Sequence, residues 1–383
     1  MPFDLQTELN ERAQQGLLRQ RQTLQSGQGR YIALNDRRYL NFSSNDYLGL
    51  AAQPFLIEAW QEGLDRWGAG SGASPLVTGY TEAHAQLEQT LAEWLQVESV
   101  LLFSTGFGAN QAVIKALLQK EHIQYQDRLN HASLQEAGAQ SPAKMRRFHH
   151  NDMAHLASLL QPRSGLIMSE GVFSMDGDQA PCEQLAELAA NSGNWLMIDD
   201  AHGIGVLGEQ GRGTLSQQGV APNSVHIRMA TFGKALGVAG AFVGGSRQFT
   251  DYLVNFARDY VYSTHMPPAQ AHAISAAVAW VKQADAERAH LQALIRQFKA
   301  GIAELGLVAG ESSTAIQPLI IGDADKAVAV ANKLRERGLW VTAIRPPTVP
   351  KGTARLRITL TAAHHLSDVS LLLNELKECV TDA

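Results

Sequence analysis

The sequence predicts an α/β fold built on a mainly parallel sheet, with a smaller α+β domain towards the C-terminus and an N-terminal arm. Short apolar runs alternate with helical patterns from Gln53 to Asp285, which is typical of parallel strands covered by helices on both faces. After a long charged helix at 286–304, the pattern changes to strands and helices of a different order. The first residues are too hydrophilic to form a core of their own.

The composition is that of a soluble globular protein. The 383 residues are 45% hydrophobic and 18% charged, and the net charge of -5 argues against a nucleic-acid partner, because general nucleic-acid binders are normally basic. Only Cys182 and Cys379 are present, which excludes a disulfide framework and a cysteine-based zinc site. No signal-peptide core or membrane-length apolar run is found, so we expect a cytoplasmic protein without a membrane partner.

The predicted arm covers residues 1–45. The segment from Asp4 to Leu24 has sparse leucines at helical spacing, which predicts a polar amphipathic helix lying on another surface. Residues 30–42 alternate between apolar and polar types around Asn35 and Asp36. This pattern predicts a hairpin with those two residues as its turn.

The predicted large domain covers residues 46–285. Helical patterns such as those at 83–95 and 182–191 separate its strands. Apolar runs predict strands at 99–103, 166–169, 195–198, 225–230 and 240–243. In such sheets ligands bind beyond the carboxyl ends of the strands, where the connecting loops meet.

The predicted small domain covers residues 286–383. Its first element is the charged helix, and two further helices are expected at 324–337 and 367–379. Strands are predicted at 315–321, 339–344 and 354–360. A unit of about a hundred residues is within the usual size of a domain.

The most informative stretch for chemistry is Thr231–Gly237, in which Lys234 lies between small residues just after a predicted strand. A lysine that is partly removed from water has a lowered pKa and can attack a carbonyl to form a Schiff base. The flanking glycines would let a ligand approach the backbone. From this heptapeptide alone, an ordinary surface lysine in a turn is an equally good interpretation.

Asp199 and His202 follow the strand predicted at 195–198, so both should emerge at the ligand-binding edge of the sheet. A carboxylate there can hold a ring nitrogen protonated, and a histidine three residues later can reach an adjacent ring oxygen. A strand-terminal aspartate can equally be a metal ligand or a helix cap. Its position relative to Lys234 favours the first role.

Two loops offer further ligand contacts. Residues 104–110 form a glycine-containing turn between a predicted strand and helix, and the backbone amides of such a helix start favour an anion such as phosphate. The same turn is equally common without a ligand. His131 opens another helix at this edge, and its ring could stack on a flat cofactor or simply belong to the helix N-terminus.

Three patterns resemble motifs but fit them poorly. The glycines of 203–208 match G-x-G-x-x-G, yet more glycines follow instead of a helix, so NAD binding is disfavoured. Gly233-Lys234 lacks the earlier glycine and the following Ser or Thr of a phosphate-binding P-loop. His149, His150 and His155 have the spacing of no standard metal motif, so we expect no metal site there.

Arg355 and Arg357 lie in a predicted strand of the small domain and alternate with an apolar residue, so both should project from one face. A planar guanidinium directed into a cleft between the domains would bind a substrate carboxylate through two hydrogen bonds. A solvated pair on an exposed sheet face is an equally good interpretation of the tripeptide.

Together these features resemble the α-oxoamine synthases, which are fold-type I pyridoxal-phosphate enzymes. The similarity runs from about Arg19 to the C-terminal helix. It is carried by NFSSNDYLG at 41–49, SEGVFSMDGD at 169–178, DDAHG at 199–203 and TFGK at 231–234. The tail from 343 to 357 favours the biotin-pathway branch of the family. The chain departs from the family pattern at 70–76, where relatives keep more glycine.

The resemblance implies a role for each matching residue. Lys234 would hold pyridoxal phosphate as a Schiff base and move protons at the substrate α-carbon. Asp199, His202 and His131 would contact the pyridine nitrogen, the ring hydroxyl and the ring face. The other implied cofactor contacts are Gly106, Phe107, Thr231 and Ser174, with Ser263 and Thr264 reaching the phosphate from the partner subunit. The implied substrate contacts are Asn45, Arg357, His131 and, at the entry of the acyl chain, Arg19.

The resemblance also implies the reaction and the partners. The enzyme would be a homodimer that joins L-alanine to a pimeloyl thioester, carried on coenzyme A or on an acyl carrier protein, with loss of carbon dioxide and thiol. Arg12, Arg19 and Arg21 with Lys144, Arg146 and Arg147 could attract an anionic carrier or be ordinary solvated charges. Sister enzymes that use glycine or serine are the nearest alternatives, and a nicotinamide oxidoreductase is a more distant one.

Overall fold

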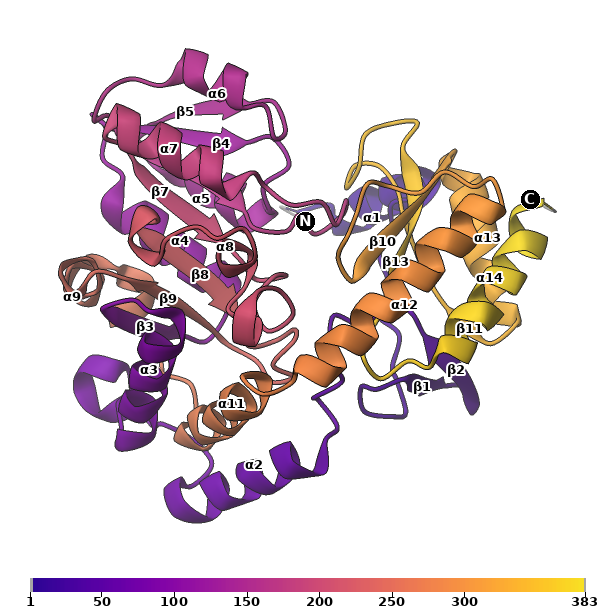
Figure 1. The fold of residues 1–383 in the computed structure, drawn as a ribbon, viewed down its shortest axis with the longest axis horizontal. Helices are drawn as coiled ribbons and strands as arrows, with labels where there is room; N and C mark the ends of the chain where they lie inside the picture. The colour runs from indigo at the N-terminus through magenta and orange to yellow at the C-terminus, as the bar shows by residue number, and fades with distance from the viewer. Residues whose placement is uncertain (1–2, 382–383) are drawn as a thin grey trace.

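The computed structural model describes residues 3–381. Its largest element is a seven-stranded sheet in the order β3-β9-β8-β7-β6-β4-β5 (Figure 1). These strands are β3 (Ser99–Phe103), β4 (Ile123–Asp127), β5 (Lys144–Phe148), β6 (Gly165–Glu170), β7 (Trp195–Asp199), β8 (Ile227–Thr231) and β9 (Ala241–Gly245). β9 is antiparallel to both of its neighbours, whereas β8, β7, β6, β4 and β5 run parallel. The predicted mainly parallel sheet is therefore confirmed.

Helices cover both faces of this sheet because successive residues of its strands point in opposite directions. Met168 and Met197 pack with α4 (Gly106–Leu117), α5 (Ala132–Gln140) and α9 (Arg247–Phe256). Ile167, Leu196 and Ile198 pack on the other side. The helices there are α6 (Met153–Leu159), α7 (Cys182–Ser192) and α8 (Thr214–Gln217).

The remaining helices of the larger lobe surround the β3 edge of the sheet and lead to the smaller lobe (Figure 1). They are α2 (Pro54–Trp67), α3 (Glu82–Leu95), α10 (Arg258–Val261) and α11 (Pro268–Val281). Short helical turns lie at η1 (Pro75–Gly79), η2 (Glu209–Gly211) and η3 (Pro222–Ser224). The first of these lies at the end of the stretch that departs from the family pattern. α2 and α3 contribute Leu56, Leu87 and Leu91 to the largest core cluster.

The C-terminal part forms a second sheet, β10-β13-β12, backed by helices. The strands are β10 (Ile316–Gly322), β12 (Thr342–Ile344) and β13 (Ala354–Thr359), all antiparallel. The helices are α12 (Asp285–Glu304), α13 (Ala324–Glu336) and α14 (Leu366–Thr381). The run at 339–344 was expected as one strand, but β11 (Leu339–Trp340) joins another sheet, so the chain changes sheets at Val341.

The N-terminal segment is less helical than predicted. α1 (Leu5–Gln14) ends ten residues before the expected boundary, because Gly16 adopts a φ of +65° that a helix cannot continue. The hairpin is confirmed as β1 (Tyr31–Leu34) and β2 (Arg37–Asn41), with Asn35 and Asp36 both at positive φ. β2 also pairs with β11, which attaches the hairpin to the C-terminal part of the chain.

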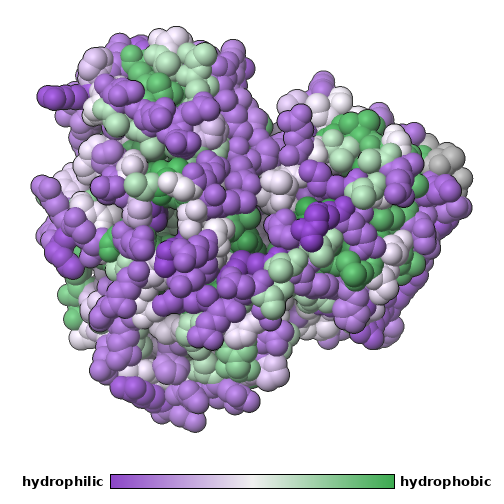
Figure 2. All heavy atoms as spheres, viewed as in Figure 1, coloured by the Kyte–Doolittle hydropathy of each residue, from purple (hydrophilic) through white to green (hydrophobic). Residues whose placement is uncertain are grey.

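The proposed domain boundaries at 45/46 and 285/286 stay predictions. The outermost residues of that division, 1–2 and 382–383, lie outside the described residues. Figure 2 shows one face of the molecule, where hydrophilic residues predominate and the surface is hollowed between the two lobes. Among residues 3–381, the structure contains no helix with the length and apolar character needed to cross a bilayer.

Candidate active site

Lys234 lies in the turn between β8 and β9, at the carboxyl end of β8. Hydrogen bonds from Phe232 N to Gly240 O and from Val238 N to Phe232 O close this turn. The Lys234 amine lies 2.7 Å from His202 Nε2. Burial lowers the pKa of Lys234 to about 8, although the nearby carboxylates act in the opposite direction. At pH 7 roughly a tenth of this amine is therefore neutral and nucleophilic, far more than for a lysine in water.

Asp199 ends the neighbouring strand β7 and is 5% exposed. Its Oδ2 accepts a hydrogen bond from Asn110 Nδ2 at 2.9 Å, and its Oδ1 accepts one from the backbone amide of Ala201. Asn110 also donates to Ser133, whose hydroxyl lies 2.8 Å from His131 Nδ1. This network fixes the Asp199 carboxylate and the His131 ring relative to one another.

His202 connects the lysine to a second network. Its Nδ1 lies 2.6 Å from the hydroxyl of Tyr47, which is fully buried and also hydrogen-bonded to Asn45 Oδ1. Burial and the nearby cations Lys234 and Arg357 hold the pKa of His202 well below its usual value, so its imidazole is neutral. Burial raises the pKa of Tyr47 to about 12, so its hydroxyl keeps its proton.

Arg357 extends this network to the C-terminal sheet. Its Nη2 donates to Asn45 Oδ1 at 3.1 Å, and its Nε donates to the backbone carbonyl of Ser174 at 2.7 Å. Arg355 projects from the same face of β13 and is paired with Asp176. Both arginines are buried, which rules out the solvated pair left open by the sequence. The guanidinium of Arg357 is instead held at the junction of the two lobes.

The amino end of α4 forms another part of the site. Thr105 caps the helix by accepting a hydrogen bond from Gly108 N, and Phe107 is 43% exposed, so the first turn is open to a ligand. A β-carbon added to Gly106 would meet Met229 and Thr231, which places this turn over the end of β8. The first-turn amides and Lys234 therefore converge on the same edge of the sheet.

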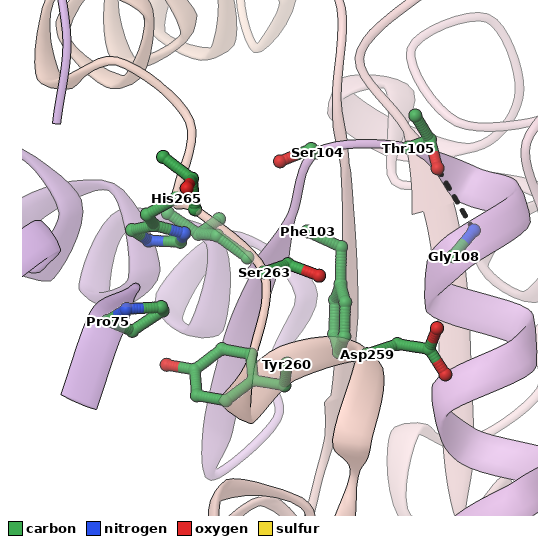
Figure 3. A pocket seen from close by; sticks show the side chains of 11 residues that line it. Pro75, Phe103, Ser104, Thr105, Gly108, Asp259, Tyr260, Ser263 and His265 are labelled. Atoms are coloured by element: carbon green, nitrogen blue, oxygen red, sulfur yellow. Dashed lines mark hydrogen bonds between the residues drawn. The ribbon is translucent and has the colours of Figure 1, made fainter. Parts of the chain in front are cut away.

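A cavity of about 80 Å³ lies beside this helix start (Figure 3). Figure 3 shows Ser263, in the segment after α10, on one side of this cavity and Thr105 and Gly108, at the start of α4, on the other. The lining residues are Pro75, Leu102, Phe103, Ser104, Thr105, Gly108, Asp259, Tyr260, Ser263, Thr264 and His265. Ser263 and Thr264 thus approach α4 within one and the same chain.

Comparison with known proteins identifies the family. The model of the family "Aminotransferase class I and II" matches residues 37–376, which is most of the chain.

The chain belongs to this aminotransferase class I and II family.

Two curated relatives in the family are similar over almost their full length. Both are named 8-amino-7-oxononanoate synthase. The one from Aeromonas salmonicida (strain A449) is 63% identical over 378 residues, covering 99% of this chain and 95% of the relative. The one from Aeromonas hydrophila subsp. hydrophila is 63% identical over 375 residues, covering 98% and 94%.

The solved structure of Sphingomonas wittichii serine palmitoyltransferase superposes with a TM-score of 0.93 and 29% identity. The match covers all of this chain and 98% of that one. The predicted fold of a fold-type I pyridoxal-phosphate transferase is thereby confirmed. The predicted membership of the α-oxoamine synthases is confirmed by the two curated relatives.

The residues present fit pyridoxal phosphate, the cofactor of this class of enzymes. Lys234 offers an amine for the aldehyde, Asp199 a carboxylate for the pyridine nitrogen, and the start of α4 amides for the phosphate. Asn110 Oδ1 and Glu170 Oε1 are buried beside these groups and have no hydrogen-bond partner among residues 3–381. Unsatisfied buried oxygens at such a point are typical of a site built for a further molecule.

Among the other predicted site residues, Ser174 and Thr231 lie beside the residues described above, and Arg19 does not. Ser174 lies in the loop between β6 and α7 that contacts Arg357, and Thr231 ends β8 beside the lysine turn. Arg19 is exposed in the segment after α1 and is not joined to the site by the contacts found within residues 3–381. Its predicted role stays a prediction.

Reasoning from the sequence missed Tyr47 and Asn110, although both lie in strings that were singled out. Each forms a hydrogen bond to a predicted site residue far away along the chain, namely Tyr47 to His202 and Asn110 to Asp199. The available signal was their place inside those strings. Spacing alone could not show which partner each would reach.

The three histidines at 149–155 lie between β5 and α6 or within α6. His149, Asp152 and His155 do come close enough for their ligand atoms to lie within 4.8 Å of one another. However, Asp152 caps α6, and His155 Nδ1 already accepts the backbone N–H of His149. His150 points elsewhere and lies between Asp127 and Asp178. His149, Asp152 and His155 therefore have local structural roles.

Proposed function

We propose that this protein condenses L-alanine with a pimeloyl thioester, giving 8-amino-7-oxononanoate, carbon dioxide and free thiol, a reaction of biotin biosynthesis. The observation that carries the proposal is the buried amine of Lys234, hydrogen-bonded to neutral His202 and connected through Tyr47 and Asn45 to Arg357. The name shared by relatives at 63% identity supports the choice of substrates.

Bound in this site, pyridoxal phosphate supplies an electron sink for the electron pair at the α-carbon of the amino acid. The Lys234 amine removes the α-proton of alanine and later returns a proton there. In between, the α-carbon forms a bond to the thioester carbonyl carbon, the carbon–sulfur bond breaks with release of thiol, and the alanine carboxylate leaves as carbon dioxide. Arg357 and Asn45 orient that carboxylate, and Asp199 keeps a positive charge at the ring nitrogen favourable.

The proposed cofactor contacts follow from position. Gly106, Phe107 and Thr231 would hold the phosphate, His131 the ring face, and Ser174 and His202 the ring hydroxyl. We further propose that Ser263 and Thr264 reach the phosphate of the partner subunit in a homodimer. Both residues are exposed in the single chain, which leaves them accessible to a second subunit.

The finer details of the substrate and location are also proposals. The acyl group would arrive on coenzyme A or on an acyl carrier protein, near Arg19, and the reaction would take place in the cytoplasm. Gly16 lies close to Arg345, which brings the segment carrying Arg19 towards the loop before β13. This arrangement supports an acyl entry on that side.

The test is thiol release from pimeloyl-coenzyme A by the cofactor-loaded protein, with L-alanine, glycine and L-serine in parallel. The proposal predicts release that depends on alanine, together with a product of the mass of 8-amino-7-oxononanoate. Because of the likeness to serine palmitoyltransferase, serine with a long acyl thioester is assayed as the competing reaction. Activity with that pair and none with alanine would contradict the proposal.

A further inference from the structure

The loop between β6 and α7, residues 171–179, contacts both lobes and is called here the bridging loop. On the side of the C-terminal sheet, its Ser174 carbonyl accepts from Arg357 and its Asp176 pairs with Arg355. Ser312 and Thr314 donate to the carbonyl of Gly177. The loop therefore supports the arginine that we assign to the substrate carboxylate.

On the other side, the bridging loop is fastened to the large sheet by His150. The Nε2 of His150 lies 2.6 Å from Asp178 Oδ2, and its Nδ1 lies 3.1 Å from Asp127 Oδ1. Asp127 ends β4 and is fully buried, so this end of the contact is fixed. The ring of Phe173 packs edge-on against the imidazole, with centroids 4.4 Å apart.

Asn151 repeats the same connection. Its backbone amide donates to Asp127 Oδ2, and its side chain donates to Asp178 Oδ2 and to the carbonyl of Gln179. The carboxylates facing His150 are Asp127 and Asp178, and both accept hydrogen bonds from it. The two ring nitrogens each face a carboxyl oxygen, and an imidazole can donate from both nitrogens only in its positively charged form.

We propose that His150 is a positioning residue, which fixes the bridging loop so that the Ser174 carbonyl holds Arg357 in place for the amino-acid carboxylate. This inference rests on the proposed function of Arg357. His150 touches neither the cofactor site nor Lys234 in the hydrogen bonds found, so it acts through the loop. Burial alone would lower the pKa of His150, but its hydrogen bonds to Asp127 and Asp178 raise the pKa to about 10, in agreement with a charged imidazole.

The test compares His150→Gln with His149→Gln, a matched change at the exposed neighbouring histidine. Alanine affinity is measured by the change in cofactor absorbance, and KM and kcat by thiol release. In His150→Gln the dissociation constant and KM for alanine should rise about tenfold, the size expected from losing one hydrogen bond to a charged group. The absorbance of bound cofactor per subunit should stay unchanged, and His149→Gln should behave as the wild type. Unchanged alanine affinity in His150→Gln would overturn the proposal.

A double variant separates positioning from a general loss of structure. If His150 acts through Arg357, its effect on alanine affinity should vanish in an Arg357→Lys background, because the two changes share one path. Additive effects would overturn the proposal. Should His150→Gln lose cofactor or fail to fold, Asp178→Asn, which removes the carboxylate on the loop side, decides in the same assays. If the wild-type protein released no thiol, only the proposed function would be refuted. The role of His150 would still be tested by the absorbance titration with alanine.

Discussion

At the scale of single residues, the site depends on groups whose protonation differs from that in water. Burial lowers the pKa of Lys234 to about 8, and burial with neighbouring cations keeps His202 neutral. Glu170 lies beside Asp199 on the adjacent strand, and burial followed by the charge of Asp199 raises its pKa well above the ordinary value. A neutral Glu170 carboxyl at this position limits the negative charge around the lysine.

The lowered pKa of Lys234 predicts how the cofactor-free protein takes up pyridoxal phosphate. Below its pKa the amine is protonated and unreactive, so the neutral fraction at pH 8 should be about one half, against roughly 0.3% for a lysine in water. The uptake rate, followed by absorbance, should rise from pH 6 and level off near pH 9. A rate that keeps rising towards pH 10.5, as for a free lysine derivative, would contradict this assignment. Lys234→Ala is the control and should not show the absorbance change of cofactor uptake.

A second residue-scale prediction concerns Tyr47. Tyr47→Phe keeps the ring in the core but removes the hydroxyl that lies 2.6 Å from His202 Nδ1. The imidazole then loses the contact that orients it against Lys234, so kcat should fall by about tenfold or more. Leaving a buried ring nitrogen unsatisfied should also lower the free energy of unfolding by about 1–3 kcal/mol. Steady-state kinetics and urea unfolding measure the two effects, and normal kcat would exclude this role.

At the scale of elements, the turns and loops of the sheet edge have backbone conformations that only certain residues allow. Gly177, in the bridging loop, has a φ of +70°, and a β-carbon there would lie 2.3 Å from the carbonyl oxygen of Ile316. Gly219 has a similar φ of +67° but open space around it. The pair therefore separates backbone strain from steric conflict.

We expect Gly177→Ala to lower the free energy of unfolding by several kcal/mol, and Gly219→Ala by only about 1–2 kcal/mol, the cost of positive φ alone. Urea unfolding measures both. Because the bridging loop must move away from Ile316, Gly177→Ala should also weaken alanine binding, whereas Gly219→Ala should not. Equal destabilisation by the two changes would show that the contact with Ile316 is easily relieved.

Elements with a regular apolar pattern were predictable from sequence, whereas two strands rich in polar side chains were not. The strands at 99–103, 166–169 and 195–198 were located correctly to within one residue at each end. β4 and β5 were missed. In β4 the side-chain NH2 groups of the buried Gln124 and Gln126 donate to carbonyls of helix α5, and that of Gln126 also donates to Gln124, contacts that exist only in the folded chain. In β5 the charged residues suit its place at the edge of the sheet.

The site followed the same rule. Lys234, Asp199, His202 and the start of α4 were found because each directly follows a recognisable strand. Tyr47 could not be assigned a partner, since its contact to His202 spans 155 positions of sequence. The burial of Arg355 and Arg357 against the bridging loop was likewise left open by the tripeptide.

At the scale of the whole molecule, the two lobes meet where Arg357 reaches Ser174 and Asn45, so their relative position determines the geometry of the site. The arm is attached to the C-terminal lobe by the pairing of β2 with β11 and by an ion pair between Arg30 and Asp368. The Asp368 side chain of this pair is buried. The proposed dimer would complete the site with Ser263 and Thr264 of a second copy.

An intersubunit complementation experiment tests that proposal. Lys234→Ala and the double variant Ser263→Asp/Thr264→Asp should each be nearly inactive, the second because its carboxylates repel the phosphate. Mixed and allowed to exchange subunits, they form hybrids in which one of the two sites has every group intact. Activity should return to roughly a quarter of the wild type, from random pairing of the two chains. If Ser263 and Thr264 instead served their own subunit, mixing would restore nothing.

The most direct test of the central claim asks which lysine holds the cofactor. The loaded protein is reduced with borohydride, which fixes pyridoxal phosphate to the lysine that carries it, and the peptides are then mapped by mass spectrometry. The buried, pKa-lowered amine of Lys234 predicts one modified peptide per subunit, containing Thr231–Gly237. Modification of any other lysine, with Lys234 unmodified, would contradict the account of this site.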